Sequence, residues 1–253
     1  MSFATCYDSA WQHPGLAWLG TLAVFLWATL QRSWHGAPRA VPAQCPRSRS
    51  RATLLWTLQL VVFLDALCTG ALSPIPAPSA WATASAVVFV ILGDARFFFV
   101  LADPALSSWG LRLRILRAVL ISGAVSVAAY AVKQAFPTQL ASSRHLFLTY
   151  ELMMFVACLF LMGLIWRRPD GPRTACQRRL LGFEVAQYGL WALADLVILS
   201  AHRWSDLGFA LRILPNALYY VAFVPFAVCL GTCNPVEDCV SERTALRKSA
   251  GRS

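Results

Sequence analysis

An aspartate and an arginine interrupt one of the most apolar stretches of this chain. The stretch VVFVILGDARFFFVLA, Val87 to Ala102, contains Asp94 and Arg96 among residues that are otherwise suited to lipid. An ionisable side chain at the centre of a membrane helix costs about 2.5–3.5 kcal/mol on insertion scales. Such a residue is therefore a candidate functional group, and the first question is what chemistry it serves.

Ionisable residues recur in the other apolar runs, so that all the runs together contain five acids and two bases. They are Asp65, Asp94, Arg96, Glu151, Glu184, Asp195 and Arg212. A buried carboxylate without a matching cation must be protonated, bind a cation or contact water. The excess of acids predicts a site for a proton, an inorganic cation or a small cationic solute.

Aromatic and amide side chains share two helix faces with these charges. The first face follows the spacing i, i+4, i+7, i+11 and consists of Glu184, Tyr188, Trp191 and Asp195. The second follows the same kind of spacing and consists of Arg212, Asn216, Tyr219 and Phe223. A face that mixes charge with Tyr and Trp suits a water-containing cavity or a cationic organic ligand, although ordinary helix packing explains the aromatic residues equally well.

The sequence lacks the motifs of metal, cofactor and hydrolase chemistry. It contains no CxxC pair, no GxSxG and no Walker A motif. His13, His145 and His202 fall near one surface and His35 in a loop, so paired histidines at membrane depth are not expected. We therefore predict no metal, no cofactor and no catalytic residue, and favour a protein that is not an enzyme.

The composition indicates an all-α integral membrane protein. Of the 253 residues, 58% are hydrophobic and 13% charged, whereas soluble domains average about 45–50% and about 25%. The net charge of +10 does not indicate nucleic acid, because the basic residues lie between apolar runs and not on a soluble face.

Seven runs approach the length of about 20 apolar residues that a helix needs to cross a bilayer. The predicted helices are Gly15–Gln31, Thr53–Leu72, Ala80–Ala102, Leu113–Phe136, Leu146–Trp166, Leu180–Ala201 and Phe209–Leu230. We assign residues 1–240 to one seven-helix transmembrane domain. Residues 241–253 are expected to form a disordered basic tail.

The distribution of Lys and Arg predicts the orientation. Most of the 22 basic residues fall in the loops after the first, third and fifth runs and in the C-terminal tail. The other side holds only Lys133, Arg144, Arg203 and Arg212. By the positive-inside rule, the N-terminus lies outside and the C-terminus in the cytoplasm. We expect a multi-pass protein of the plasma membrane or of a bacterial inner membrane.

Counting along the helices, with a rise of about 1.5 Å per residue, divides the charges by depth. A cytoplasmic group contains Asp94, Arg96 and Glu184, and an outer group contains Glu151, Asp195 and Arg212. We expect Arg96 to pair with an acid on another helix, since residues at i and i+2 point to different faces. Asp65 lies at mid-depth without an arginine and is the strongest single candidate for binding a proton or cation.

A weak internal echo relates two segments of the chain. DARFFFVLADPALSSWGLRLRIL is similar to DLVILSAHRWSDLGFALRIL, and the match would relate helices two to four to helices five to seven. Units with an odd number of helices are inverted in the membrane, as in many transporters. Chance similarity between Leu- and Arg-rich segments explains the echo as well.

Three functions are compatible with this pattern. The first is a carrier or channel for a cation, a proton or a small cationic solute that uses the buried carboxylates. The second is a seven-helix receptor or sensor that binds a ligand and works through a partner. The third is an enzyme acting on lipid or quinone, with Asp94 and Glu184 as acid and base. The expected partners are the lipid bilayer and a small ligand or ion, with a second copy or a protein partner left open and nucleic acid excluded.

Overall fold

The computed structural model describes residues 15–34, 46–69, 73–76, 79–101, 111–140, 142–200 and 205–231. Within these ranges every regular element is a helix, which confirms the all-α prediction. The predicted basic tail, residues 241–253, lies outside the described residues, so the division into a domain and a tail stays a prediction.

The described helices form six single rods and one rod that changes its winding. The single rods are α2 (Leu16–Trp34), α3 (Pro46–Thr69), α4 (Ala80–Leu101), α5 (Leu111–Ala135), α6 (Ser143–Trp166) and α7 (Pro172–Ser200). The last rod consists of α8 (Ser205–Ala217), the π-helical segment η4 (Leu218–Ala222) and α9 (Phe223–Gly231).

These helices extend further into the basic segments than the apolar runs indicate. Helix α7 begins at Pro172 and not at Leu180, and α3 begins at Pro46 and not at Thr53. Proline is favoured in the first turn because its missing N–H would have no helical partner there. Hydropathy marks the apolar part of a helix, whereas backbone hydrogen bonding continues into polar sequence.

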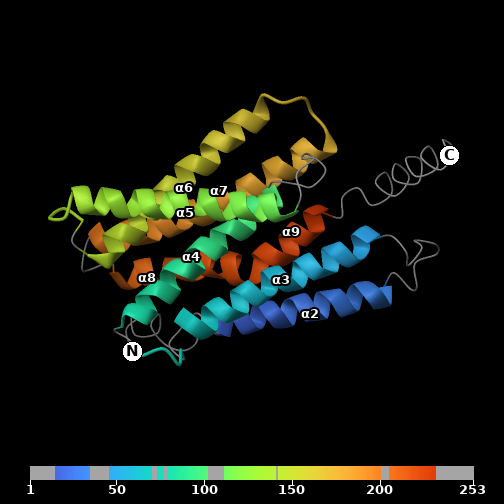
Figure 1. Cartoon of the computed structure of the whole chain (residues 1–253), viewed down its shortest axis with the longest axis horizontal. Helices are drawn as coiled ribbons and strands as arrows, with labels where there is room; N and C mark the ends of the chain where they lie inside the picture. Colours follow the sequence, from blue (N-terminus) through green and yellow to red (C-terminus); the bar gives the residue numbers. More distant parts are fainter. Residues whose placement is uncertain are drawn as a thin grey trace.

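Successive rods run in opposite directions (Figure 1). Helices α2, α4, α6 and α8 begin at one end of the bundle, which we call the α8 end. Helices α3, α5 and α7 begin at the opposite end, where α9 stops, and we call it the α9 end. Short connections between apolar helices favour such antiparallel neighbours.

Five helices of the described chain are long and apolar enough to cross a membrane. They cover Ala80–Leu101, Arg112–Ala135, Arg144–Trp166, Thr174–Ser200 and Ser205–Ala227. Two shorter apolar stretches, Leu16–Leu26 and Thr57–Thr69, lie in α2 and α3. The rods therefore match the seven predicted runs, and five of them meet the length and composition of a membrane span.

The bundle places apolar side chains outside and many polar ones inside. Val127 is 67% exposed and Phe160 66%, whereas Asp195 is 0% and Glu184 2% exposed. A protein in water favours the reverse distribution, because large apolar patches on its surface are unfavourable. An apolar exterior around buried charges is compatible with a multi-pass bundle in lipid.

The change of winding at η4 coincides with a close approach between two helices. Pro215 stands inside α8 and lacks the N–H that a regular helix would use. Gly20 of α2 packs directly on η4, since a Cβ atom there would lie 2.1 Å from the Tyr220 carbonyl oxygen. Only a glycine permits this contact, which holds α2 against the π-helical segment.

Candidate functional site

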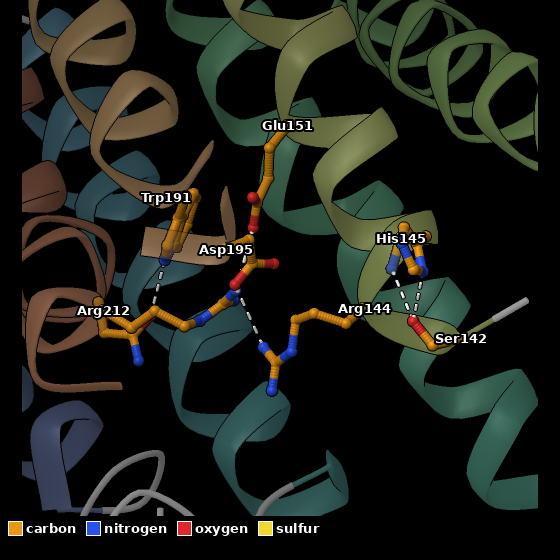
Figure 2. A network of polar contacts seen from close by, with 8 residues as sticks. Ser142, Arg144, His145, Glu151, Trp191, Asp195 and Arg212 are labelled. Carbon is orange, nitrogen blue, oxygen red and sulfur yellow. Dashed lines mark hydrogen bonds and ion pairs between the residues drawn. The ribbon is translucent and has the colours of Figure 1, made fainter. Parts of the chain in front are cut away.

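Four charged side chains meet near the α8 end and form what we call the Asp195 cluster: Arg144, Glu151, Asp195 and Arg212. Arg212 Nη1 donates to Asp195 Oδ1, and Arg144 Nη1 lies 3.4 Å from the same oxygen. Arg212 Nη1 also lies 3.4 Å from Glu151 Oε1. Figure 2 shows Glu151 pointing from α6 toward Asp195, with the two guanidinium groups converging on that carboxylate. Two acids and two bases thus neutralise one another.

The start of α6 is fixed by a side-chain cap, and this sets the position of Arg144. The Ser142 hydroxyl accepts a hydrogen bond from the His145 backbone N–H at 3.3 Å, as expected of an N-cap serine. Arg144 follows in the first turn, and Glu151 is seven residues further along the same face. Both side chains therefore point toward α7 and α8.

A second set of buried polar side chains lies nearer the α9 end. We call it the Asp94 cluster, and it consists of Asp94, Arg96, Glu184, Gln187 and Tyr188. The Tyr188 hydroxyl donates to Asp94 Oδ1 between α7 and α4. Gln187 Nε2 lies 3.5 Å from Glu184 Oε2, one helical turn away. These residues, with Phe97 and aromatic residues of the last rod, enclose a space too small to hold a water molecule.

Arg96 does not form the ion pair that the sequence predicted. Its guanidinium carbon lies 4.5 Å from the Tyr219 ring centre and 5.1 Å from the Phe223 ring centre. Its Nε donates to the Gly93 carbonyl oxygen at 3.2 Å. Within the described chain, no carboxylate oxygen lies within the 4.0 Å ion-pair distance of Arg96. Aromatic rings of the last rod occupy the positions where a carboxylate was expected, and they stabilise the cation through their faces.

Gly93 allows the last rod to approach the Asp94 cluster. A Cβ atom on Gly93 would lie 1.9 Å from the Tyr219 hydroxyl oxygen. Tyr219 belongs to η4, whose wider winding presents this ring to α4 and the ring of Tyr220 to α3. Short π-helical segments are frequent at functional sites.

An aromatic layer, which includes Tyr188 of the Asp94 cluster, lies between the charged side chains of the two clusters. It consists of Tyr188, Trp191 and Tyr219, with ring centres 5.4 Å apart for Tyr188 and Trp191 and 5.5 Å apart for Trp191 and Tyr219. Trp191 Nε1 donates to Asn216 Oδ1 at 2.8 Å, which satisfies the indole within the layer. Along α7 the layer lies between Glu184 and Asp195, which are about 16 Å apart by helical rise.

Asp65 lies on α3, beside the Asp94 cluster and not in it. Its Oδ1 accepts from the Thr69 hydroxyl at 2.8 Å and its Oδ2 from the Tyr220 hydroxyl at 3.3 Å. The Tyr220 ring in turn contacts Tyr219 edge-on, with ring centres 4.8 Å apart. A continuous series of side chains thus joins Asp65 to Arg96.

Several buried polar atoms in these clusters have no hydrogen-bond partner in the described structure. They are Asp94 Oδ2, Arg96 Nη1, Glu151 Oε2, Gln187 Oε1 and Asp195 Oδ2. Burying a polar atom without a partner costs about 1–3 kcal/mol. Such atoms keep hydrogen-bonding positions that a bound species, or a second conformation of the protein, can fill.

The structure can be compared with the two groups of charged residues that the sequence suggested. The structure brings Glu151, Asp195 and Arg212 together, and Asp94 and Glu184 line one space. Sequence reasoning missed the contribution of Arg144. Its spacing, seven residues before the candidate Glu151, is the signal that identifies it.

The fold and the clusters define a class of protein: a helical bundle with membrane-length apolar helices around a polar interior. Within the described residues, no group of three or more His, Cys, Asp or Glu side chains is arranged to hold a metal ion. No family model, no curated protein and no solved structure matches this chain. Function is therefore argued from the site alone.

Proposed function

We propose that this protein is a seven-helix membrane carrier for a cation, a proton or a small cationic solute. The N-terminus would lie outside and the C-terminus in the cytoplasm, in a plasma membrane or a bacterial inner membrane. The observation that carries the proposal is the Asp94 cluster, in which two buried carboxylates and one guanidinium group line a space too small for a water molecule.

The distribution of basic side chains supports the proposed orientation. Exposed arginines of the described chain gather where α5 and α7 begin and where α6 stops, at the α9 end: Arg112, Arg117, Arg167, Arg168 and Arg179. The α8 end has Lys133, Arg144 and the buried Arg212 in the described helices. The positive-inside rule places the α9 end in the cytoplasm. A reporter fused to the C-terminus is expected to be active only on the cytoplasmic side.

The arrangement of the polar clusters supports transport. A carrier needs a site near the middle of the membrane that is closed to both sides at some stage of its cycle. The Asp94 cluster is closed, the aromatic layer lies between it and the α8 end, and the Asp195 cluster lies beyond that layer. A change in the last rod at η4 would open this route, because η4 contributes Tyr219 to the aromatic layer.

Flux through proteoliposomes tests the proposal. The purified protein is reconstituted in vesicles, and uptake of protons and of labelled monovalent cations is followed under an imposed gradient and membrane potential. We expect flux with the unchanged protein and its loss in Asp94→Asn and Glu184→Gln. Asp206→Asn removes an exposed carboxylate at the start of α8 and is expected to keep full flux.

Each outcome of this experiment has a defined meaning. Absence of flux in the unchanged protein, with its fold verified by circular dichroism, would refute the carrier. Binding of a cationic ligand without flux would favour the receptor. Equal flux in Asp94→Asn, Glu184→Gln and Asp206→Asn would contradict a transport site in the Asp94 cluster.

A further inference from the structure

The Asp94 cluster holds more negative than positive charge in a dry space. Asp94 and Glu184 are 4% and 2% exposed, and Arg96 is 3% exposed. With both acids ionised, the three groups would carry one net negative charge in a space that excludes water. An uncompensated ion is strongly unfavourable away from water, so the cluster needs one additional positive charge.

The charged and titratable neighbours come from each helix packed on the space. They are Asp94 and Arg96 of α4, Glu184 and Tyr188 of α7, Tyr219 of η4 and Cys158 of α6. Cys158 lies close enough to both carboxylates to interact with them electrostatically. Arg96 is the only cation in this set, and its guanidinium lies against aromatic rings and not against either acid.

The unpartnered atoms indicate which species is missing. Asp94 Oδ2 and Gln187 Oε1 are both hydrogen-bond acceptors, and neither has a donor. Both residues line the space. Two acceptors cannot bond to each other. Adding a proton to a carboxyl oxygen makes it a donor, so one proton supplies the missing charge and gives the space a donor that it lacks.

The size of the space excludes larger occupants of this closed form. It has no volume for a water molecule, so a hydrated cation or a cationic organic molecule would require the helices to separate. A proton needs no volume beyond its O–H bond. We infer that Asp94 and Glu184 share one proton in this closed form and that the proton is the ion the protein carries.

The role of this proton rests on the proposed function, but its presence does not. Protonation leaves one neutral carboxyl, one carboxylate and one guanidinium group in the cluster, so the cluster is neutral. When the site opens to water, the proton leaves as hydronium and the cluster becomes negative. The Tyr188 hydroxyl, which donates to Asp94 Oδ1, orients that carboxyl in both states.

Infrared spectroscopy of the purified protein tests this inference, since a protonated carboxylic acid has its own C=O stretching band that shifts on H/D exchange. At neutral pH we expect this band in the unchanged protein. Asp94→Asn and Glu184→Gln should each lose the intensity of one acid per chain, because either change makes acids and guanidinium groups equal in number. Asp206→Asn is the matched control and should keep the full band, because Asp206 is exposed at the start of α8 and lies outside the Asp94 cluster.

The experiments distinguish refutation of the shared proton from refutation of the proposed carrier function. Absence of the band in the unchanged protein, or full intensity in both cluster variants, would overturn the shared proton even if flux of another cation is observed. The band without flux would retain the shared proton and refute the carrier. If neither variant folds, alkaline titration of the unchanged protein decides: a band that stays constant until unfolding contradicts a proton that is carried.

Discussion

Replacing Arg212 by methionine should destabilise the bundle by an amount that the Asp195 cluster defines. Asp195 is 0% exposed, and Arg212 donates to it while lying 3.4 Å from Glu151. Removing one member of a buried ion pair costs about 3–5 kcal/mol, because the remaining charge is left uncompensated. Arg144 stays 3.4 Å from Asp195, so we expect a loss near the lower end of that range.

The assay is the free energy of unfolding in mixed micelles, measured by denaturant titration of each purified variant. A second change, Asp195→Asn, should restore about 1–3 kcal/mol in the Arg212→Met background, as expected for directly coupled residues. The control is Arg178→Met, whose partner Asp170 is 86% exposed. An exposed pair contributes about 0–1 kcal/mol. Equal losses in Arg212→Met and Arg178→Met, or no recovery in the double variant, would refute the reasoning.

Three further predictions use the same unfolding assay. Gly93→Ala should cost about 1–3 kcal/mol by overpacking against the Tyr219 hydroxyl, and Tyr219→Phe in the same chain should recover most of it. Gly123→Ala, where no heavy atom lies within 4 Å of a Cβ atom, should be neutral or stabilising by about 0.5–1 kcal/mol; a similar loss at both glycines would contradict the contact. Tyr188→Phe should cost about 1–3 kcal/mol, because the buried carboxyl on α4 loses its donor; an unchanged free energy would mean that the hydrogen bond is not formed. Ser142→Ala should cost about 0.5–2 kcal/mol and speed amide hydrogen exchange in the first turn of α6, and unchanged exchange there would exclude the cap.

Sequence reasoning was most successful where a local rule applied. Membrane-length apolar runs predicted the rods, and five of them meet the length and composition of a span. The ends were less accurate: α7 begins at Pro172 and not at Leu180, because helical hydrogen bonding continues past the last apolar residue. The two faces defined by 3.6-residue periodicity contact each other, since Trp191 meets Asn216 and Asp195 meets Arg212.

The choice of partner for Arg96 shows where such reasoning stops. Its depth and its place beside Asp94 predicted a carboxylate partner, yet it lies over Tyr219 and Phe223. This depends on the rotation of the last rod, which the π-helical segment Leu218–Ala222 changes. No pattern in the sequence predicted that segment.

The sequence by itself determined the helices and their apolar surfaces, because these follow from composition and from the periodicity of a single helix. Only the tertiary structure decided that Arg144 joins the Asp195 cluster and that the Asp94 cluster is closed to water. The physical reason is that hydrogen bonding within a helix is local. The contacts between α4, α7 and η4 join residues far apart in the chain, and close approaches such as that at Gly93 determine them.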